Sequence, residues 1–166
     1  MSNRQHVVNK SPTWSPAGEA FTAFLMRVFP LDHRLTAAGE ALAGRAGQTL
    51  ARWLVLEAIQ SEPATVADIA RGMGQARQGV QRLANLLVGS GLARYQDNPR
   101  HRSASLLSIT PDGAAALRRI QHTQRDWSNR LGAEIGEQEL ERASALMDRV
   151  LQLVTRDLPS LQELQR

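Results

Sequence analysis

The sequence contains no cysteine, and this absence excludes several kinds of chemistry. Without thiols the chain forms no disulfide, holds no metal through a thiolate and senses no oxidant through a thiol. No apolar run approaches the length needed to cross a bilayer, and the N-terminus lacks the apolar region of a secretory signal. We therefore expect a cytoplasmic protein that does not contact a membrane.

Motifs for catalysis and for metal binding are also missing. The sequence shows no glycine-rich phosphate-binding loop and no nucleophile paired with a base. The histidines show no metal-ligand spacing with carboxylates or with each other: His6, His33, His101 and His122. We therefore expect no enzyme activity, no catalytic residue, no metal and no cofactor.

Lysine is nearly absent, since Lys10 is the only one and every other cation is arginine. Arginine is suited to bidentate contacts with phosphate and guanine. A GC-rich genome that favours arginine codons explains the overall bias equally well, so this observation alone does not identify a partner.

The positive charge is concentrated in one segment. Between Thr65 and Thr110 there are six arginines and two aspartates, an excess of four that equals the net charge of +4 for the whole chain. A basic patch confined to one module is typical of proteins that bind a polyanion.

This basic segment has the pattern of a winged helix-turn-helix. We expect a short helix, a tight turn, a second helix and two strands joined by a hairpin, with these bounds: Thr65–Arg71, Gly72–Gly74, Ala76–Val88, Leu92–Tyr95, Gln96–Arg102 and Ser103–Ile109. In the last strand, Leu107 and Ile109 alternate with Ser108 and are expected to face the core.

The second helix has one apolar and one polar face. The apolar residues are expected to pack on Val66, Ile69 and Ala70 of the first helix: Val80, Leu83, Ala84 and Leu87. The polar face carries residue types that recognise base edges and phosphates: Arg77, Gln78, Gln81, Arg82 and Asn85. We expect the first three to contact bases and Arg82 to contact phosphate, with Thr65 as a further DNA-contacting residue. The alternative is an ordinary solvated face.

Two other features of this segment bear on DNA binding. Gly79 lies inside the second helix, and close approach of the backbone to DNA, a crowded packing site or simple sequence drift would each explain it. In the hairpin, Arg100 or Arg102 is expected to enter a minor groove, with His101 beside them. Asp97 is expected to support the wing through a salt bridge to one of these arginines.

Helices are predicted on both sides of the winged helix. Ser15 and Pro16 begin one helix, which Pro30 should kink or briefly break. Thr110 and Pro111 begin another, which should run to about Leu131 before a break at Gly132–Gly136. The last helix begins at Glu137 and carries an apolar stripe: Leu140, Ala143, Met147, Val150, Leu151, Val154 and Leu158.

The predicted fold class is mainly α with a small β-wing, in which terminal dimerisation helices flank the winged helix-turn-helix. Apolar stripes on the terminal helices are expected to pair with a second copy of the chain, although a monomeric helical bundle is the alternative. We expect four regions: a mobile tail at 1–13, an N-terminal dimerisation helix at 14–47, the DNA-binding domain at 48–110 and C-terminal dimerisation helices at 111–166.

Several segments resemble the MarR family of transcriptional regulators over roughly residues 20–155: Thr65–Ala70, Leu83–Leu87, Gly91–Leu92, the wing at Asp97–Arg102 and Leu107–Gly113. The resemblance implies a homodimer that binds double-stranded DNA at a pseudo-palindromic operator, usually as a repressor. Many members release DNA when a small aromatic or anionic molecule binds.

The resemblance also places a ligand pocket where the winged helix meets the dimerisation helices. Trp53 and His33 are the best candidates for its walls, with Arg52 and Phe24 as further ones, and plain core packing is the alternative.

The chain departs from the family pattern at three positions. Ala76 replaces a helix-capping serine, Gly79 replaces threonine or serine, and His101 replaces an arginine of the wing. A second class of function, a winged-helix module that binds a protein and never touches DNA, stays open.

Overall fold

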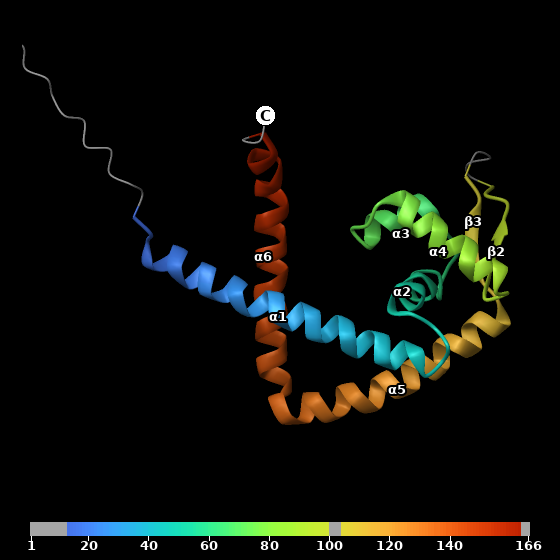
Figure 1. The fold of residues 1–166 in the computed structure, drawn as a ribbon, viewed down its shortest axis with the longest axis horizontal. Coiled ribbons are helices and arrows are strands. Elements are labelled where there is room, and N and C mark those ends of the chain that lie inside the picture. The colour runs from blue at the N-terminus through green and yellow to red at the C-terminus, as the bar shows by residue number, and fades with distance from the viewer. Residues whose placement is uncertain (1–12, 100–103, 164–166) are drawn as a thin grey trace, which may run out of the picture. The chain divides into compact units, whose positions relative to one another are not determined.

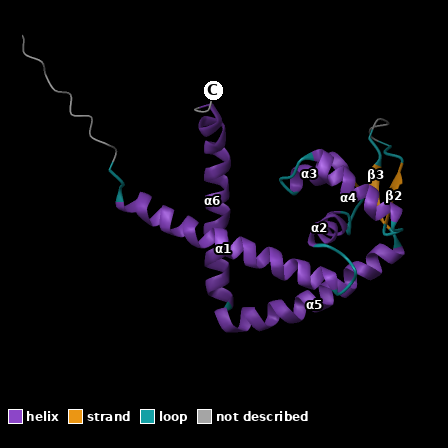
Figure 2. Ribbon diagram, viewed as in Figure 1, coloured by secondary structure: helices purple, strands orange, loops and turns teal. Residues whose placement is uncertain are grey.

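The computed structural model describes residues 13–99 and 104–163, which are mostly helical with one small sheet (Figure 1, Figure 2). The elements follow in this order: α1 (Pro16–Gly44), α2 (Leu50–Ala58), β1 (Ala64–Thr65), α3 (Val66–Gly72), α4 (Arg77–Gly89), β2 (Ala93–Gln96), β3 (Leu106–Ile109), α5 (Pro111–Ile135) and α6 (Glu137–Glu163). The predicted fold class, mainly α with a small β-wing, is confirmed.

The chain forms two compact units, residues 1–50 and 51–166. In the first, the Ser15 hydroxyl caps α1 by accepting a hydrogen bond from the Gly18 amide at 3.1 Å. The helix then continues through Pro30, so the break considered there is wrong, and a kink stays a prediction. Proline removes one backbone donor, and the remaining hydrogen bonds of this 29-residue helix keep it continuous.

In the second unit, α3 and α4 pack through the faces that the sequence predicts. Residues of both helices are buried: Val66, Ile69, Ala70, Val80, Ala84 and Leu87. Leu83 is only half-buried, so it lies at the edge of this core. The turn between the helices passes through Gly74, whose φ of +63° favours glycine.

The sheet has the order β1-β3-β2, and both pairings are antiparallel. β1 was not predicted, and β2 is displaced by one residue from the expected strand. β3 begins at Leu106, not at Ser103, which lies outside the described residues. The pairing of β3 with both β1 and β2 begins at Leu106, which lies opposite Thr65 and Gln96.

The predicted alternation along β3 is wrong for Ser108, which is buried beside Leu107, while Ile109 is half-buried. β3 is the central strand, and the Ser108 hydroxyl finds hydrogen-bond partners on Arg94 of the neighbouring strand β2. Ser108 Oγ donates to the Arg94 carbonyl at 3.3 Å and accepts from Arg94 Nε at 3.4 Å.

The start of α5 is fixed to the base of the wing. The Thr110 hydroxyl donates to the Gly91 carbonyl at 2.7 Å and accepts from the Gly113 amide at 3.0 Å. A Cβ added at Gly113 would fall on the Leu92 carbonyl oxygen and lie 2.9 Å from Ile109 Cγ1. Only glycine permits this close approach of a helix to the backbone just before β2.

α5 continues through Gly132 to Ile135, so the predicted end near Leu131 is wrong. One glycine inside a helix costs about 1 kcal/mol, which neighbouring residues offset. The chain leaves the helix at Gly136, where φ is +96°, and α6 then turns away from α5 (Figure 1). Within the described residues, no helix has the length and apolar character needed to span a membrane.

Replacing Gly113 with alanine should destabilise the fold by about 3 kcal/mol or more, because the new methyl group meets backbone atoms that cannot rotate away. Gly132→Ala in the same helix is the matched control. Its Cβ meets nothing within 4 Å, so this change should stabilise the protein by roughly 0.5–1 kcal/mol. Denaturant unfolding measures both changes, and equal effects would refute the role given to Gly113.

Candidate nucleic-acid interface

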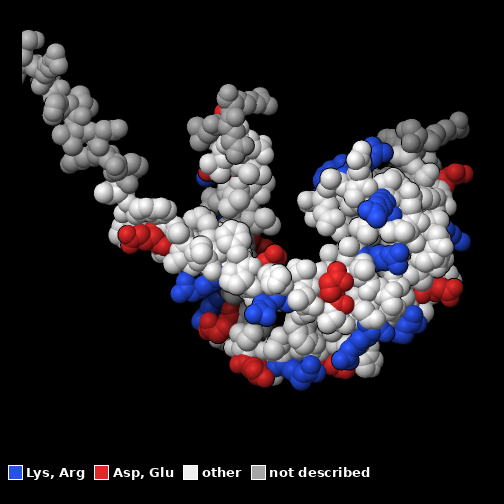
Figure 3. Space-filling model, in the orientation of Figure 1, with Lys and Arg blue, Asp and Glu red and all other residues white. Residues whose placement is uncertain are grey.

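α4 presents a polar surface opposite its buried stripe. Because Val80, Ala84 and Leu87 face the core, the predicted DNA-contacting residues of this helix point outward. Gln81 is half-buried, and the other four are exposed: Arg77, Gln78, Arg82 and Asn85. Figure 3 shows basic side chains spread over the region of α3 and α4. The fold therefore gathers five predicted residues on one helix.

Thr65 lies at the start of α3, and its hydroxyl is already engaged. It accepts from the Asp68 amide at 3.2 Å and donates to Asp68 Oδ2 at 2.7 Å. Asp68 Oδ1 also pairs with Arg71 Nη1 at 2.8 Å. Thr65 therefore acts first as a helix cap, and its contact with DNA stays a prediction.

Gly79 lies on the open side of α4. A Cβ built there meets no atom within 4 Å, so the explanation by a crowded packing site is wrong. Simple sequence drift and close approach of DNA to the α4 backbone both stay open.

Tyr95, which the sequence pattern did not single out, extends from β2 to the polar face of α4. Gln81 Nε2 donates to Tyr95 Oη at 2.6 Å and to Asn85 Oδ1 at 3.1 Å. Tyr95 Oη donates to Asn85 Oδ1 at 2.9 Å. We call these three residues the amide–tyrosine triad. Its only sequence signal is a single tyrosine in the second strand, which does not identify its partners.

A hollow of about 240 Å³ lies beside this triad, lined by Val66, Ala67, Arg77, Gln81, Tyr95, Ala104 and Ser105. It brings together α3, the first turn of α4 and the base of the wing. Arg77 and Gln81 therefore line one recess between helix and wing.

The described residues do not include three of the predicted DNA-contacting residues of the hairpin: Arg100, His101 and Arg102. The predicted salt bridge of Asp97 to one of these arginines lies outside the described residues too. Asp97 itself is exposed at the end of β2. The DNA-contacting role of this hairpin stays a prediction.

The predicted ligand-pocket residues fall in different units. Phe24 and His33 belong to α1, where the Phe24 ring stacks on Phe21 with centroids 6.4 Å apart. Arg52 and Trp53 belong to α2, and buried Trp53 donates from Nε1 to Glu57 Oε2 at 3.1 Å. The core packing of Trp53 is evident, and a pocket formed by these four residues stays a prediction.

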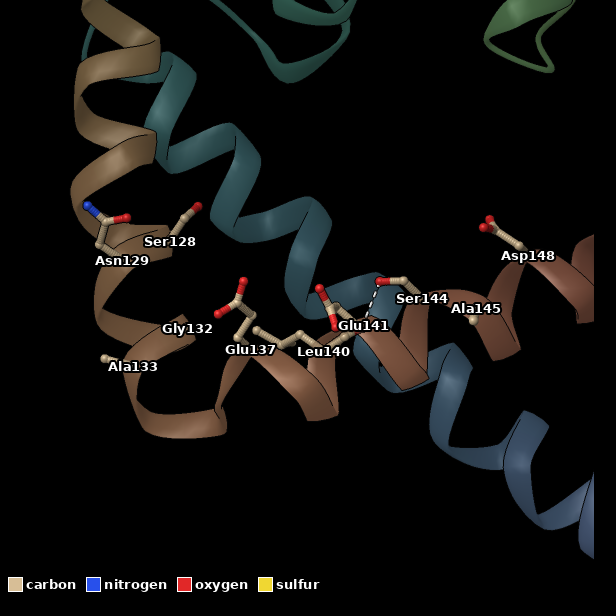
Figure 4. A pocket seen from close by; sticks show the side chains of 10 residues that line it. All are labelled: Ser128, Asn129, Gly132, Ala133, Glu137, Leu140, Glu141, Ser144, Ala145 and Asp148. Atoms are coloured by element: carbon tan, nitrogen blue, oxygen red, sulfur yellow. Dashed lines mark hydrogen bonds between the residues drawn. The ribbon is translucent and has the colours of Figure 1, made fainter.

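Two further hollows lie in the second unit. One follows the bend between α5 and α6 (Figure 4) and has a volume of about 790 Å³, with Glu137, Glu141 and Asp148 along it. The other, of about 550 Å³, lies between α2 and α3 and includes Leu54, Ile69 and Met73. Over residues 13–99 and 104–163, no group of three or more metal-ligand side chains is present.

Comparisons with known proteins agree with this architecture. The model of the MarR family matches residues 46–102. Two uncharacterized proteins, one of Mycobacterium tuberculosis and one of Mycobacterium bovis, are each 36% identical to this chain over 132 residues. The match covers 80% of this chain and 92% of each relative. The chain belongs to the MarR family.

Solved structures share the fold at lower identity. A crystal structure of a MarR family transcription regulator has a TM-score of 0.71 at 22% identity, covering 87% of this chain and 94% of its own. A mutant MarR from E. coli complexed with operator DNA has a TM-score of 0.66 at 20% identity, covering 76% and 95%. Staphylococcus aureus MarR in complex with salicylate and kanamycin has a TM-score of 0.68 at 15% identity, covering 85% and 93%.

The N-terminus of α4 lacks a side-chain cap, because its N-cap residue is Ala76 and makes no such hydrogen bond. Ala76→Ser should supply an oxygen that accepts from an amide of the first turn and stabilise the protein by about 1 kcal/mol. Thr110→Ala, at the capped start of α5, should change stability in the opposite direction. Thermal unfolding compares the two, and a neutral or destabilising Ala76→Ser would contradict the expectation.

Proposed function

We propose that the protein is a sequence-specific DNA-binding transcriptional regulator, a ligand-responsive repressor that acts in the cytoplasm as a homodimer on a pseudo-palindromic operator. The observation that carries this proposal is the outward face of α4. It presents exposed Arg77, Gln78 and Arg82 on the second helix of a winged helix-turn-helix. In such folds this helix enters the major groove of DNA.

The chemistry of this face supports the assignment of roles. Arg77, in the first turn of α4, is placed to donate to guanine O6 and N7, and Gln78 to contact a neighbouring base. Arg82 lies one turn further and supplies charge to the phosphate backbone. Arg100, His101 and Arg102 would extend the contact into the minor groove, with Asp97 supporting the wing. Gly79 leaves the α4 backbone uncovered for close approach.

The terminal helices support a dimer. No residue of α6 is buried, and Leu151 is 66% exposed. In α1, Met26 and Phe29 are each 66% exposed. Apolar side chains left exposed along a helix are typical of an interaction surface, so we infer that residues 14–47 and 111–166 pair with those of a second copy. Two α4 helices would then occupy major grooves about 34–36 Å apart.

Repression and ligand response rest on family membership. The E. coli relative was solved with operator DNA, and the S. aureus relative with salicylate and kanamycin. We propose that a small aromatic or anionic ligand favours a dimer whose α4 helices are wrongly spaced for DNA. Affinity for the operator would fall by the ratio of the ligand's affinities for the two forms.

Selection of bound duplexes from random DNA tests the proposed function. The full chain should enrich a two-fold symmetric site. Arg77→Ala should weaken binding to that site and relax the preference at one base pair, costing about 1–3 kcal/mol. Arg82→Ala should weaken binding to all duplexes alike, because a phosphate contact carries no sequence information.

Arg118→Ala provides the control, because it removes an exposed arginine from α5 and leaves α4 intact. It should alter neither affinity nor preference. Unchanged binding by Arg77→Ala would remove this residue from base recognition, and an equal loss for all three variants would show that only net charge matters.

A further inference from the structure

The amide–tyrosine triad fixes which polar groups α4 presents. A side-chain amide offers two N–H donors and one acceptor oxygen. Both N–H groups of Gln81 are used, one on Tyr95 Oη and one on Asn85 Oδ1. Asn85 Oδ1 in turn accepts from both Gln81 and Tyr95. Among the described residues, nothing occupies Gln81 Oε1 or Asn85 Nδ2. Position 81 therefore presents an acceptor and position 85 presents two donors.

This arrangement changes what the two amides recognise. A free glutamine or asparagine reads adenine by donating to N7 and accepting from N6 with one amide. Neither Gln81 nor Asn85 has both a donor and an acceptor available in the triad. An acceptor alone matches the amino group of cytosine or adenine, whereas two donors match O6 and N7 of guanine.

We propose that Tyr95 is a specificity-determining residue, which holds Gln81 as an acceptor and Asn85 as a donor and so removes their preference for adenine. The inference rests on the proposed DNA-binding function. At the base pair that faces Gln81, cytosine and adenine are accepted alike, and at the pair that faces Asn85, guanine is preferred. Tyr95 acts by positioning, through the hydroxyl that it extends from β2.

Tyr95→Phe tests this inference, because it removes the hydroxyl and keeps the ring. One N–H of Gln81 then becomes free while Oε1 stays available, which restores the pair of groups that reads adenine. Selection from random duplexes should show adenine favoured over cytosine at the Gln81 position by about tenfold, the size of one good bidentate contact. Side-chain amide resonances of Gln81 and Asn85 in the unbound chain should also shift.

Thr123→Val is the matched control. It removes a hydroxyl that is bonded to the Arg119 carbonyl on α5, and it should leave base preference unchanged. Gln81→Glu gives a second test in which Tyr95 stays intact. Glutamate has acceptors only, so cytosine and adenine should still be accepted at this position.

Each outcome decides the inference. A folded Tyr95→Phe protein that selects the same sites as the wild type overturns the role of Tyr95 and leaves the proposed function intact. If the preference at the Gln81 position changes from adenine in the wild type to cytosine in Gln81→Glu, the wild-type amide reads adenine. That result also overturns the role of Tyr95 and leaves the proposed function intact. Failure of the wild-type chain to bind any duplex overturns the proposed function, and this inference with it.

Discussion

The contact between the start of α5 and the base of the wing is the constraint on which the second unit depends. At Gly113 the helix meets the Leu92 carbonyl so closely that no side chain fits between them. Thr110 adds a hydrogen bond to Gly91 and caps the same helix. One short segment therefore fixes the end of β3, the start of β2 and the direction of α5.

The polar face of α4 inherits its geometry from this junction. Buried Val80, Ala84 and Leu87 set the rotation of α4, and the register of β2 against β3 places Tyr95 beside it. The wing strand therefore does more than carry the basic hairpin, because Tyr95 also contacts two amides on the polar face of α4. α5 connects this arrangement to α6 through the bend at Gly136, and Gln121 of α5 donates at 2.7 Å to Gln60, which lies just after α2.

Much of this architecture could be predicted from local signals. The spacing of apolar residues indicated α3 and α4, and the Thr110–Pro111 pair marked the start of α5. The two-residue strand β1 could not be predicted, because only pairing with β3 defines it. The end of α5 was expected at Gly132, but that glycine keeps a helical conformation. The helix ends before Gly136, which has a positive φ. The partners of Tyr95 depend on strand register, which a single exposed residue does not reveal.

The central claim is that two copies of the α4 face engage one DNA duplex through arginine–phosphate and base contacts. Sedimentation of the full chain with a labelled duplex that carries its selected site, over a range of salt concentrations, tests this claim most directly. We predict two chains per duplex and an association constant that falls steeply with salt, by about one power of concentration for each phosphate contacted. A single chain that leaves the duplex unbound at low ionic strength, or binding that salt does not weaken, would contradict it.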